Sequence, residues 1–234
     1  MENKKVFMCA LMAIVLLATL LIKCVNNNSS FENDALKFKN EYEILNGKKN
    51  NASDDAYEEI KISSNNPIIY ASYSDVEELV TNGTGVIYFG FPECPWCRAA
   101  VPVLLDAANE SGIDKIYYFN AVKIRDKKHL NEVGEIVTDE EGTAEYSKLI
   151  QLLYDNLGQY EGLNNPSIKR LYFPTVVFVK DGEVIGTHIG TLESHDDVKN
   201  VLNESQSVEL REIYLGYILE VLGIICNDKA DVKC

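Results

Sequence analysis

The sequence is poor in basic residues and in histidine. Of its 234 residues, 22 are Lys or Arg against 36 Asp or Glu, and the formal net charge is −14. A surface of this sign repels phosphate groups, so we expect no nucleic acid among the partners. There are three histidines, of which we interpret His188 and His195 as ordinary surface or edge residues, and no second C-x-x-C accompanies Cys94 and Cys97. Because a zinc site needs further closely spaced ligands, the sequence predicts no metal site.

Aliphatic side chains are scarce between residues 25 and 66, where Asn, Ser, Lys, Asp and Glu predominate. Such a composition buries too little apolar surface to offset the conformational entropy lost on ordering. The sequence therefore predicts a flexible spacer over residues 25–66. The chain length suits one domain with extensions, which we expect to begin near Pro67.

The longest apolar run lies near the N-terminus. Val6 to Ile22 form 17 uncharged residues, preceded by Lys4 and Lys5. This length exceeds the signal-peptide core of about 7–15 residues and reaches the low end of the roughly 17–25 that span a bilayer, so cleavage and retention both stay open. The two lysines favour a cytoplasmic N-terminus and an exported remainder. We interpret residues 1–24 as a signal peptide or membrane anchor.

Cys24, just after this run, is a lipidation candidate. Leu21-Ile22-Lys23-Cys24 resembles the bacterial lipoprotein signal, although Lys23 stands where that signal normally has a small residue. The alternative is a cysteine just past a signal anchor. Both hypotheses place the rest of the chain outside the cytoplasm, anchored to the cell membrane by the N-terminal segment or by lipid on Cys24.

Apolar patterning from residue 67 onward predicts alternating strands and helices. Strands are expected at 68–70, 85–90, 115–120, 175–179 and 184–189, the last two joined as a hairpin through Asp181-Gly182. Helices are expected at 74–80, with Ser74 as the cap, at 95–109 and at 205–225. We interpret residues 126–170 as a mainly helical insertion. Strand, helix, strand in this order implies a parallel pair with a right-handed crossover, hence an α/β domain.

Cys94-Pro95-Trp96-Cys97 directly follows the predicted buried strand and opens a predicted helix. Unpaired amides and the helix dipole stabilise an anion there, so Cys94 can become a thiolate near neutral pH. Cys94 is then the attacking sulfur, and Cys97, one turn later, resolves the mixed disulfide. Pro95 suits the first helical turn, and Trp96 would flank the sulfurs with an apolar surface. We expect Arg98 to favour the thiolate.

These elements resemble the thioredoxin family. Cys94 to Cys97 after a buried strand, with Pro102 five residues further on, is similar to the active-site helix of thioredoxin. Phe173-Pro174, at the start of a strand, resembles the family's cis-proline loop. The resemblance covers roughly residues 67–205.

The resemblance implies a thioredoxin fold, a central mixed sheet flanked by helices, here with a helical insertion and a C-terminal helix. It also implies that Pro174 is cis and faces the two sulfurs, with the Phe173 backbone available to an extended substrate chain.

Two departures from thioredoxin stand out. The family's buried acid, six residues before the first cysteine, falls on Tyr88, and residues 126–170 lengthen the stretch between cysteines and cis-proline. Both features, with the N-terminal segment and the C-terminal cysteines, resemble the thioredoxin-like bacteriocin transport accessory proteins of Gram-positive bacteria.

Two further cysteines, Cys226 and Cys234, follow the last predicted helix. In an oxidising compartment we expect a structural disulfide between them; a second redox pair and two free thiols are the alternatives. A structural disulfide between Cys94 and Cys97 that never turns over is also conceivable, but so small a loop would stabilise the fold little.

The sequence thus predicts a membrane-tethered extracytoplasmic thiol–disulfide oxidoreductase for exported proteins or peptides, with the Cys94–Cys97 disulfide and no cofactor. Pro95, Trp96, Phe173 and Pro174 are the candidate substrate-binding residues. An external location favours an oxidant or isomerase, whereas a membrane tether suits equally a reductase fed by an integral membrane redox partner. The alternative function is a tethered accessory or chaperone-like binding module for peptide export, with incidental redox activity.

Overall fold

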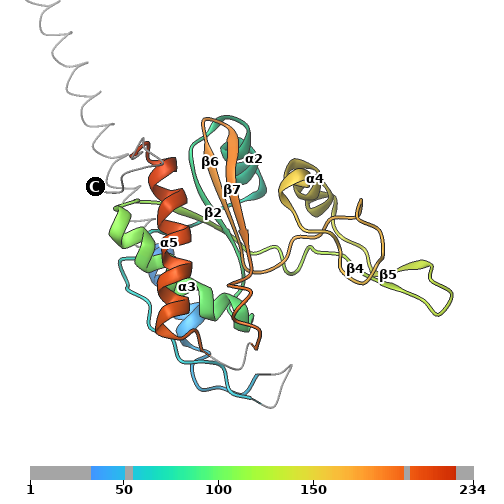
Figure 1. The fold of residues 1–234 in the computed structure, drawn as a ribbon, viewed down its shortest axis with the longest axis horizontal. Coiled ribbons are helices and arrows are strands. Elements are labelled where there is room, and N and C mark those ends of the chain that lie inside the picture. The colour runs from blue at the N-terminus through green and yellow to red at the C-terminus, as the bar shows by residue number, and fades with distance from the viewer. Residues whose placement is uncertain (1–32, 51–54, 198–200, 225–234) are drawn as a thin grey trace, which may run out of the picture.

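The computed structural model describes residues 33–50, 55–197 and 201–224 (Figure 1). The apolar run, Cys24, Cys226 and Cys234 lie outside the described residues, so membrane targeting, lipidation and the C-terminal disulfide stay predictions. Within the described ranges, none of the helices has the length and apolar character needed to cross a membrane.

A five-stranded mixed sheet, in the order β1-β3-β2-β6-β7, forms the centre of the domain. Its strands are β1 (Ile68–Tyr70), β2 (Gly85–Phe89), β3 (Ile116–Phe119), β6 (Thr175–Lys180) and β7 (Glu183–Ile189). The first three run parallel, whereas β6 is antiparallel to both β2 and β7. All residues of β2 are buried, as its continuous apolar sequence predicts.

Helices cover both faces of the sheet (Figure 1). They are α2 (Tyr73–Asn82), α3 (Pro95–Ser111), α4 (Ala144–Leu152) and α5 (Glu204–Val221). Because side chains alternate along a strand, Val86 and Tyr88 pack in the core beneath α3 and α5, and Ile87 and Phe89 in the core beneath α2 and α4. The predicted fold class, a mixed sheet flanked by helices with a C-terminal helix, is confirmed.

The β6–β7 hairpin turns at Asp181-Gly182, as predicted. Both residues have positive φ, 51° and 77°, the conformation that a two-residue hairpin turn requires and that Asp-Gly favours. A Cβ on Gly182 would lie 2.3 Å from the carbonyl oxygen of Thr81, so the close approach of α2 also requires glycine here.

The predicted flexible spacer is wrong for the described part of residues 33–66. Residues 33–43 form a helix on which Ala35, Phe38 and Tyr42 are buried against the sheet. The following segment buries Ile60 and Ile62 in the same core. Apolar residues are few in this region, but three of them recur at the helical spacing, a signal that composition alone does not register.

The cap of α2 is Ser72, and the expectation of Ser74 is wrong. The Ser72 hydroxyl accepts a hydrogen bond from the Asp75 amide, and the Asp75 carboxylate accepts one from the Ser72 amide at 2.7 Å. Asp75 therefore supplies the second half of a capping box two residues earlier in the chain than predicted.

The insertion is only partly helical, so that prediction is wrong for its first half. Strands β4 (Lys127–Leu130) and β5 (Ile136–Glu140) form a hairpin that projects from the domain (Figure 1). The Asn131 side chain accepts hydrogen bonds from the amides of Val133 and Glu135, a turn signal that the sequence interpretation overlooked. Helix α4 and a short 3-10 helix, Tyr154–Asn156, follow.

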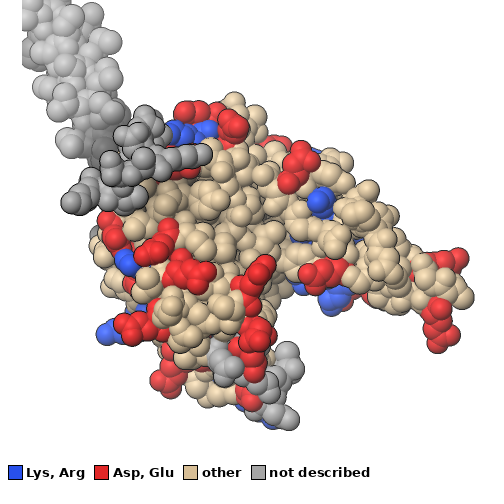
Figure 2. Space-filling view, in the orientation of Figure 1, with Lys and Arg blue, Asp and Glu red and all other residues tan. Residues whose placement is uncertain are grey.

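Acidic side chains outnumber basic ones on the face shown in Figure 2, including the end of the projecting hairpin. This distribution agrees with the net charge of −14. The surface in this view offers no broad basic patch of the kind that binds a phosphate backbone.

Candidate redox site

The two cysteines occupy the first turn of α3, directly beyond the buried strand β2. Cys94 is the N-cap residue, in extended backbone conformation, and Cys97 follows one turn into the helix. The amide of Cys97 donates a hydrogen bond to Sγ of Cys94 across 3.2 Å. Cys94 remains 6% exposed and Cys97 is fully enclosed, and both are free thiols. The outer sulfur therefore sits where helix-end amides stabilise negative charge.

The pKa values of the two thiols move in opposite directions. The pKa of Cys94 is lowered, and the largest cause is a hydrogen bond from the Cys97 thiol. Burial acts in the opposite direction, whereas the amides of Cys97 and Trp96 and the charge of Arg125 lower the pKa further. Burial, followed by the hydrogen bond and charge of Cys94, holds the pKa of Cys97 well above its ordinary value. Of the two thiols in the reduced pair, Cys94 is therefore the one that loses its proton more readily.

Arg98 does not take the predicted role beside the thiolate. Its buried guanidinium turns to the N-terminal segment and donates hydrogen bonds to the Tyr42 carbonyl at 2.8 Å and to Oδ1 of Asn46 at 2.6 Å. The cation that favours the Cys94 thiolate is Arg125, whose guanidinium lies 5.0 Å from the ring centre of Phe173. Arg125 follows β3, 31 positions from Cys94 in the chain, so local sequence around the cysteines contains no signal for it.

The segment that resembles a cis-proline loop lies against the outer cysteine. The Phe173–Pro174 peptide bond is cis, as the resemblance implies. Sγ of Cys94 lies 3.6 Å from the Phe173 carbonyl oxygen, and the amide of Gly190 donates a hydrogen bond to the Pro174 carbonyl at 2.8 Å. Residues 79 positions apart in the chain thus meet at one sulfur.

An open cavity of about 1090 Å³ is lined by neighbours of the cysteines but not by the cysteines themselves. Trp96 and Phe173 line it, whereas Pro95 and Pro174, the other two candidate substrate-binding residues, do not. The insertion contributes Gln159 to the lining. The cavity therefore has a mixed polar and apolar lining formed by residues from α3, the segment before β6, the insertion, and the end of β7 with the chain that follows it.

His188 lies on the edge strand β7, as the interpretation as a surface or edge residue allows, whereas for His195 that interpretation is wrong. His195 is 4% exposed, its ring lies 5.1 Å from that of Trp96, and Nδ1 is 2.9 Å from the Thr191 hydroxyl. Nε2 of His188 is 2.6 Å from the Thr191 carbonyl oxygen, and burial lowers the pKa of His188. Both histidines line the cavity, His188 from β7 and His195 from the chain that follows this strand.

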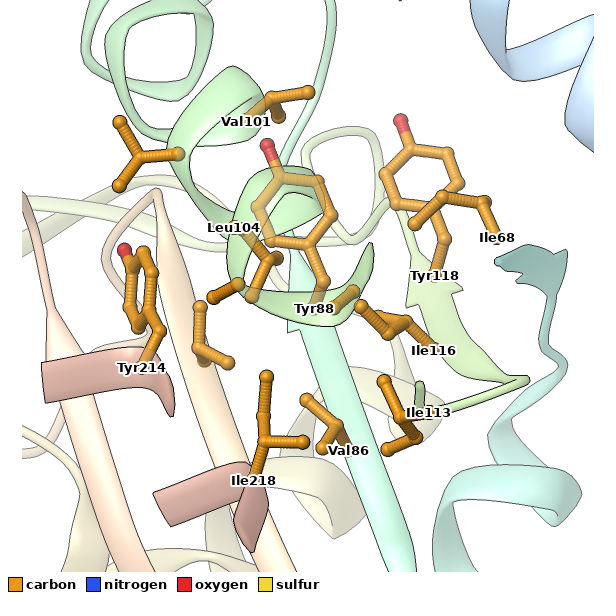
Figure 3. Packing of buried hydrophobic residues seen from close by; sticks show 14 of the residues in the cluster. Ile68, Val86, Tyr88, Val101, Leu104, Ile113, Ile116, Tyr118, Tyr214 and Ile218 are labelled. Carbon is orange, nitrogen blue, oxygen red and sulfur yellow. The ribbon is translucent and has the colours of Figure 1, made fainter. Parts of the chain in front are cut away.

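Tyr88 stands where the thioredoxin family has a buried acid. It is fully buried on β2, and its hydroxyl is 2.9 Å from the hydroxyl of Tyr42. Figure 3 shows Tyr88 beside Tyr118, with their hydroxyls on the same side of the sheet. No three His, Cys, Asp or Glu side chains gather as a metal site would require in the part of the chain that the structure describes.

Comparisons with known proteins assign the chain to no family. No family model matches the chain, and no curated protein matches it. Among solved structures, oxidised thioredoxin O2 from Arabidopsis thaliana is similar, with 18% sequence identity and a TM-score of 0.34. The match covers 67% of this chain and 95% of the thioredoxin. A functional assignment therefore depends on the geometry around Cys94 and Cys97, and the likeness to bacteriocin transport accessory proteins stays a prediction.

Proposed function

We propose that the protein is a membrane-tethered extracytoplasmic thiol–disulfide oxidoreductase that acts on exported proteins or peptides through Cys94 and Cys97. The observation that supports this most is the asymmetry of the two sulfurs. Cys94, at the helix start, reaches the surface and has a lowered pKa, whereas Cys97 is enclosed and keeps its proton. An attacking and a resolving thiol require this division.

In the reducing direction, the Cys94 thiolate attacks one sulfur of a substrate disulfide. A bond forms between that sulfur and Sγ of Cys94, and the other substrate sulfur leaves as a thiolate, which takes a proton from water. Cys97 then loses its proton and attacks Sγ of Cys94, and the second substrate sulfur leaves as a thiol. Two electrons pass to the substrate, and the Cys94–Cys97 disulfide remains. The oxidising direction is the same sequence in reverse.

The surroundings of Cys94 fit a polypeptide substrate. Trp96 and Phe173 form apolar parts of the wall of the cavity of about 1090 Å³, and Sγ of Cys94 lies 3.6 Å from the carbonyl oxygen of Phe173. An extended chain with a disulfide can lie along these walls and bring one sulfur to Cys94, the outer of the two cysteines.

Trapping the mixed disulfide tests the proposed reaction. Cys97→Ala, mixed with an excess of a peptide that contains one intramolecular disulfide, should accumulate a peptide adduct on Cys94 that mass spectrometry locates. The matched control, Cys94→Ser with Cys97 intact, should accumulate none because the remaining thiol is enclosed and protonated. Absence of the adduct in Cys97→Ala would overturn the proposal.

The same variants separate an enzyme from a binding module. The double variant Cys94→Ser with Cys97→Ser is placed in cells that normally make the protein. If the process that requires the protein continues in these cells, the accessory function replaces the redox function. Loss of the role with normal folding supports the enzyme.

Labelling in intact cells tests the location. Val133, 77% exposed at the end of the projecting hairpin, can be replaced by cysteine without touching the redox site. We expect a membrane-impermeant thiol reagent to label Val133→Cys in intact cells above the level of the parent chain. Labelling of Val133→Cys only after lysis would contradict an extracytoplasmic domain.

A further inference from the structure

Arg125 lies against the segment that leads into β6. Its guanidinium carbon is 5.0 Å from the ring centre of Phe173, and its Nη1 donates a hydrogen bond to the carbonyl oxygen of Leu171 across 3.5 Å. The carbonyl oxygen of Phe173 is in turn 3.6 Å from Sγ of Cys94. The positive charge of Arg125 is therefore close to the backbone that contacts the outer cysteine.

A second arginine, Arg170, belongs to the same segment and directly precedes Leu171. Its guanidinium carbon is 4.3 Å from the ring centre of Tyr160 and 5.7 Å from that of Tyr172. The residue is partly exposed, but its Nε is buried and has no hydrogen-bond partner among the described residues. The two aromatic rings therefore stabilise the guanidinium where it lies but leave its positive charge in full.

Neither arginine forms an ion pair with a carboxylate in the part of the chain that the structure describes. Asp126, next to Arg125 in the chain, pairs with Lys128. Burial and, next, the charge of Arg170 lower the pKa of Arg125, as two like charges close together require. Partly buried cations are normally paired, so this arrangement is unfavourable until an anion joins it.

An effect on the Cys94 thiolate accounts for Arg125 but not for Arg170. Arg125 is among the main influences that lower the pKa of Cys94, whereas Arg170 is not. The chain has 36 acidic residues from which a partner for Arg170 could come, yet the described carboxylates leave both guanidiniums unpaired. Two unpaired cations beside a reactive thiol are a feature of sites that receive an anion from outside.

From these contacts we infer that Arg125 and Arg170 determine specificity by binding a carboxylate that flanks the reactive disulfide of the substrate. The inference rests on the proposed disulfide exchange and names the chemical class of its substrate: peptides with Asp or Glu beside their cysteines. A guanidinium binds a carboxylate through paired hydrogen bonds, and an acidic side chain next to a sulfur held at Cys94 is within reach of this segment.

The net charge of the chain predicts the opposite preference. At −14 overall, the surface repels acidic peptides and slows their encounter with the site. Faster reaction with an acidic peptide therefore requires local positive charge, which distinguishes the arginine pair from a general electrostatic effect.

The test compares two peptides with the full chain, reduced and held in micelles of an uncharged detergent. Each peptide contains one intramolecular disulfide, and the residues that flank both cysteines are Glu in one peptide and Gln in the other. Samples are quenched with acid at intervals, and peptide mapping counts the mixed disulfide on Cys94 together with the Cys94–Cys97 disulfide. The readout is the ratio of the initial rates, Glu peptide over Gln peptide, in which any change in the thiolate fraction of Cys94 cancels.

We expect a rate ratio of about five in the parent chain, the gain for a well-placed ion pair at a partly exposed site, and a smaller ratio at high salt. Arg170→Gln should bring the ratio to about one or below and leave the rate with the Gln peptide within about twofold of the parent. Arg170→Lys should restore part of the ratio. Lys169→Gln, the matched control, removes the neighbouring charge over the Tyr154 ring and should leave the ratio unchanged.

A parent ratio of one or below, or equal losses in Arg170→Gln and Lys169→Gln, would overturn the inference. Should Arg170→Gln fail to fold by near-ultraviolet circular dichroism, Arg125→Gln decides by the same ratio, because its effect on the Cys94 thiolate is common to both peptides. Failure of the proposed function itself gives a different result, since the parent chain would then form no mixed disulfide at Cys94 with either peptide.

Discussion

The guanidinium of Arg98 donates two hydrogen bonds to the backbone carbonyl of Glu58, from Nε at 3.1 Å and from Nη2 at 2.5 Å. Further donors reach the carbonyl of Tyr42 and the side chain of Asn46. A fully buried cation is stable only where its donors are paired, and here most partners come from the segment before residue 60. The active-site helix and the N-terminal segment therefore fold as one unit.

Replacing Arg98 should destabilise the domain strongly. Arg98→Met leaves several buried carbonyl groups without donors, so we expect the free energy of unfolding in urea to fall by about 3 kcal/mol or more. Arg211→Met is the control because Arg211 pairs with Glu110 at the surface, and it should cost at most about 1 kcal/mol. Equal effects of the two substitutions would contradict the structural role of Arg98.

A chain that lacks all residues before residue 60 should not form the native core. Phe38 and Tyr42 are both fully buried, and the loss of one large aromatic side chain costs about 3–5 kcal/mol. We expect a chain that begins at residue 33 to unfold cooperatively in urea and one that begins at residue 60 to lose cooperative unfolding. Similar transitions for both chains would restore the flexible-spacer hypothesis.

Removing the charge of Arg125 should make Cys94 less reactive near neutral pH. Arg125 favours the thiolate and lowers the pKa of Cys94, so Arg125→Gln should move that pKa upward. The rate of alkylation of Cys94 by iodoacetamide, followed against pH, should then reach half its maximum at a higher pH.

Lys169→Gln is the matched control for this charge effect. It removes one positive charge from the insertion, at a residue whose ammonium group lies over the Tyr154 ring. An equal shift in Lys169→Gln would mean that net charge, and not the position of Arg125, sets the reactivity of Cys94.

His188 should make the stability of the domain fall on acidification. Burial lowers the pKa of His188 below the ordinary value of 6.5, so in the acidic range the unfolded chain binds a proton more readily than the folded one. The free energy of unfolding then decreases as the pH falls through about 6.5, and this contribution is absent at pH 8, where both states are neutral. In His188→Gln, urea unfolding between pH 8 and 5 should show a smaller acid loss than the parent chain. Parallel curves would contradict the effect.

Local sequence was sufficient for the elements that position the two cysteines. The continuous apolar run of β2 predicted a buried strand, and Cys94-Pro95-Trp96-Cys97 directly after it predicted the start of α3. Asp181-Gly182 predicted the β6–β7 turn through the backbone conformation that those residues favour. These features depend on neighbours within a few residues, which is the information that a single sequence contains.

Residues that act across long distances in the chain were not predictable in this way. Arg98 looked like a partner of the adjacent thiolate, but its side chain is buried among carbonyls up to 56 positions earlier. His195 looked exposed beside two aspartates, yet it packs on Trp96. The helix at residues 33–43 was not predicted because the composition of this segment is polar on average, and only one face of the helix is apolar.

The reduction potential of the Cys94–Cys97 pair tests the proposed redox function most directly. Trp96 is the single tryptophan, so its fluorescence during titration of the full chain with glutathione or dithiothreitol buffers reports on this pair and not on the other cysteines. We predict a two-electron transition between about −120 and −270 mV, the range of exchanging dithiols. A transition below about −300 mV would identify a structural disulfide and contradict the proposed function.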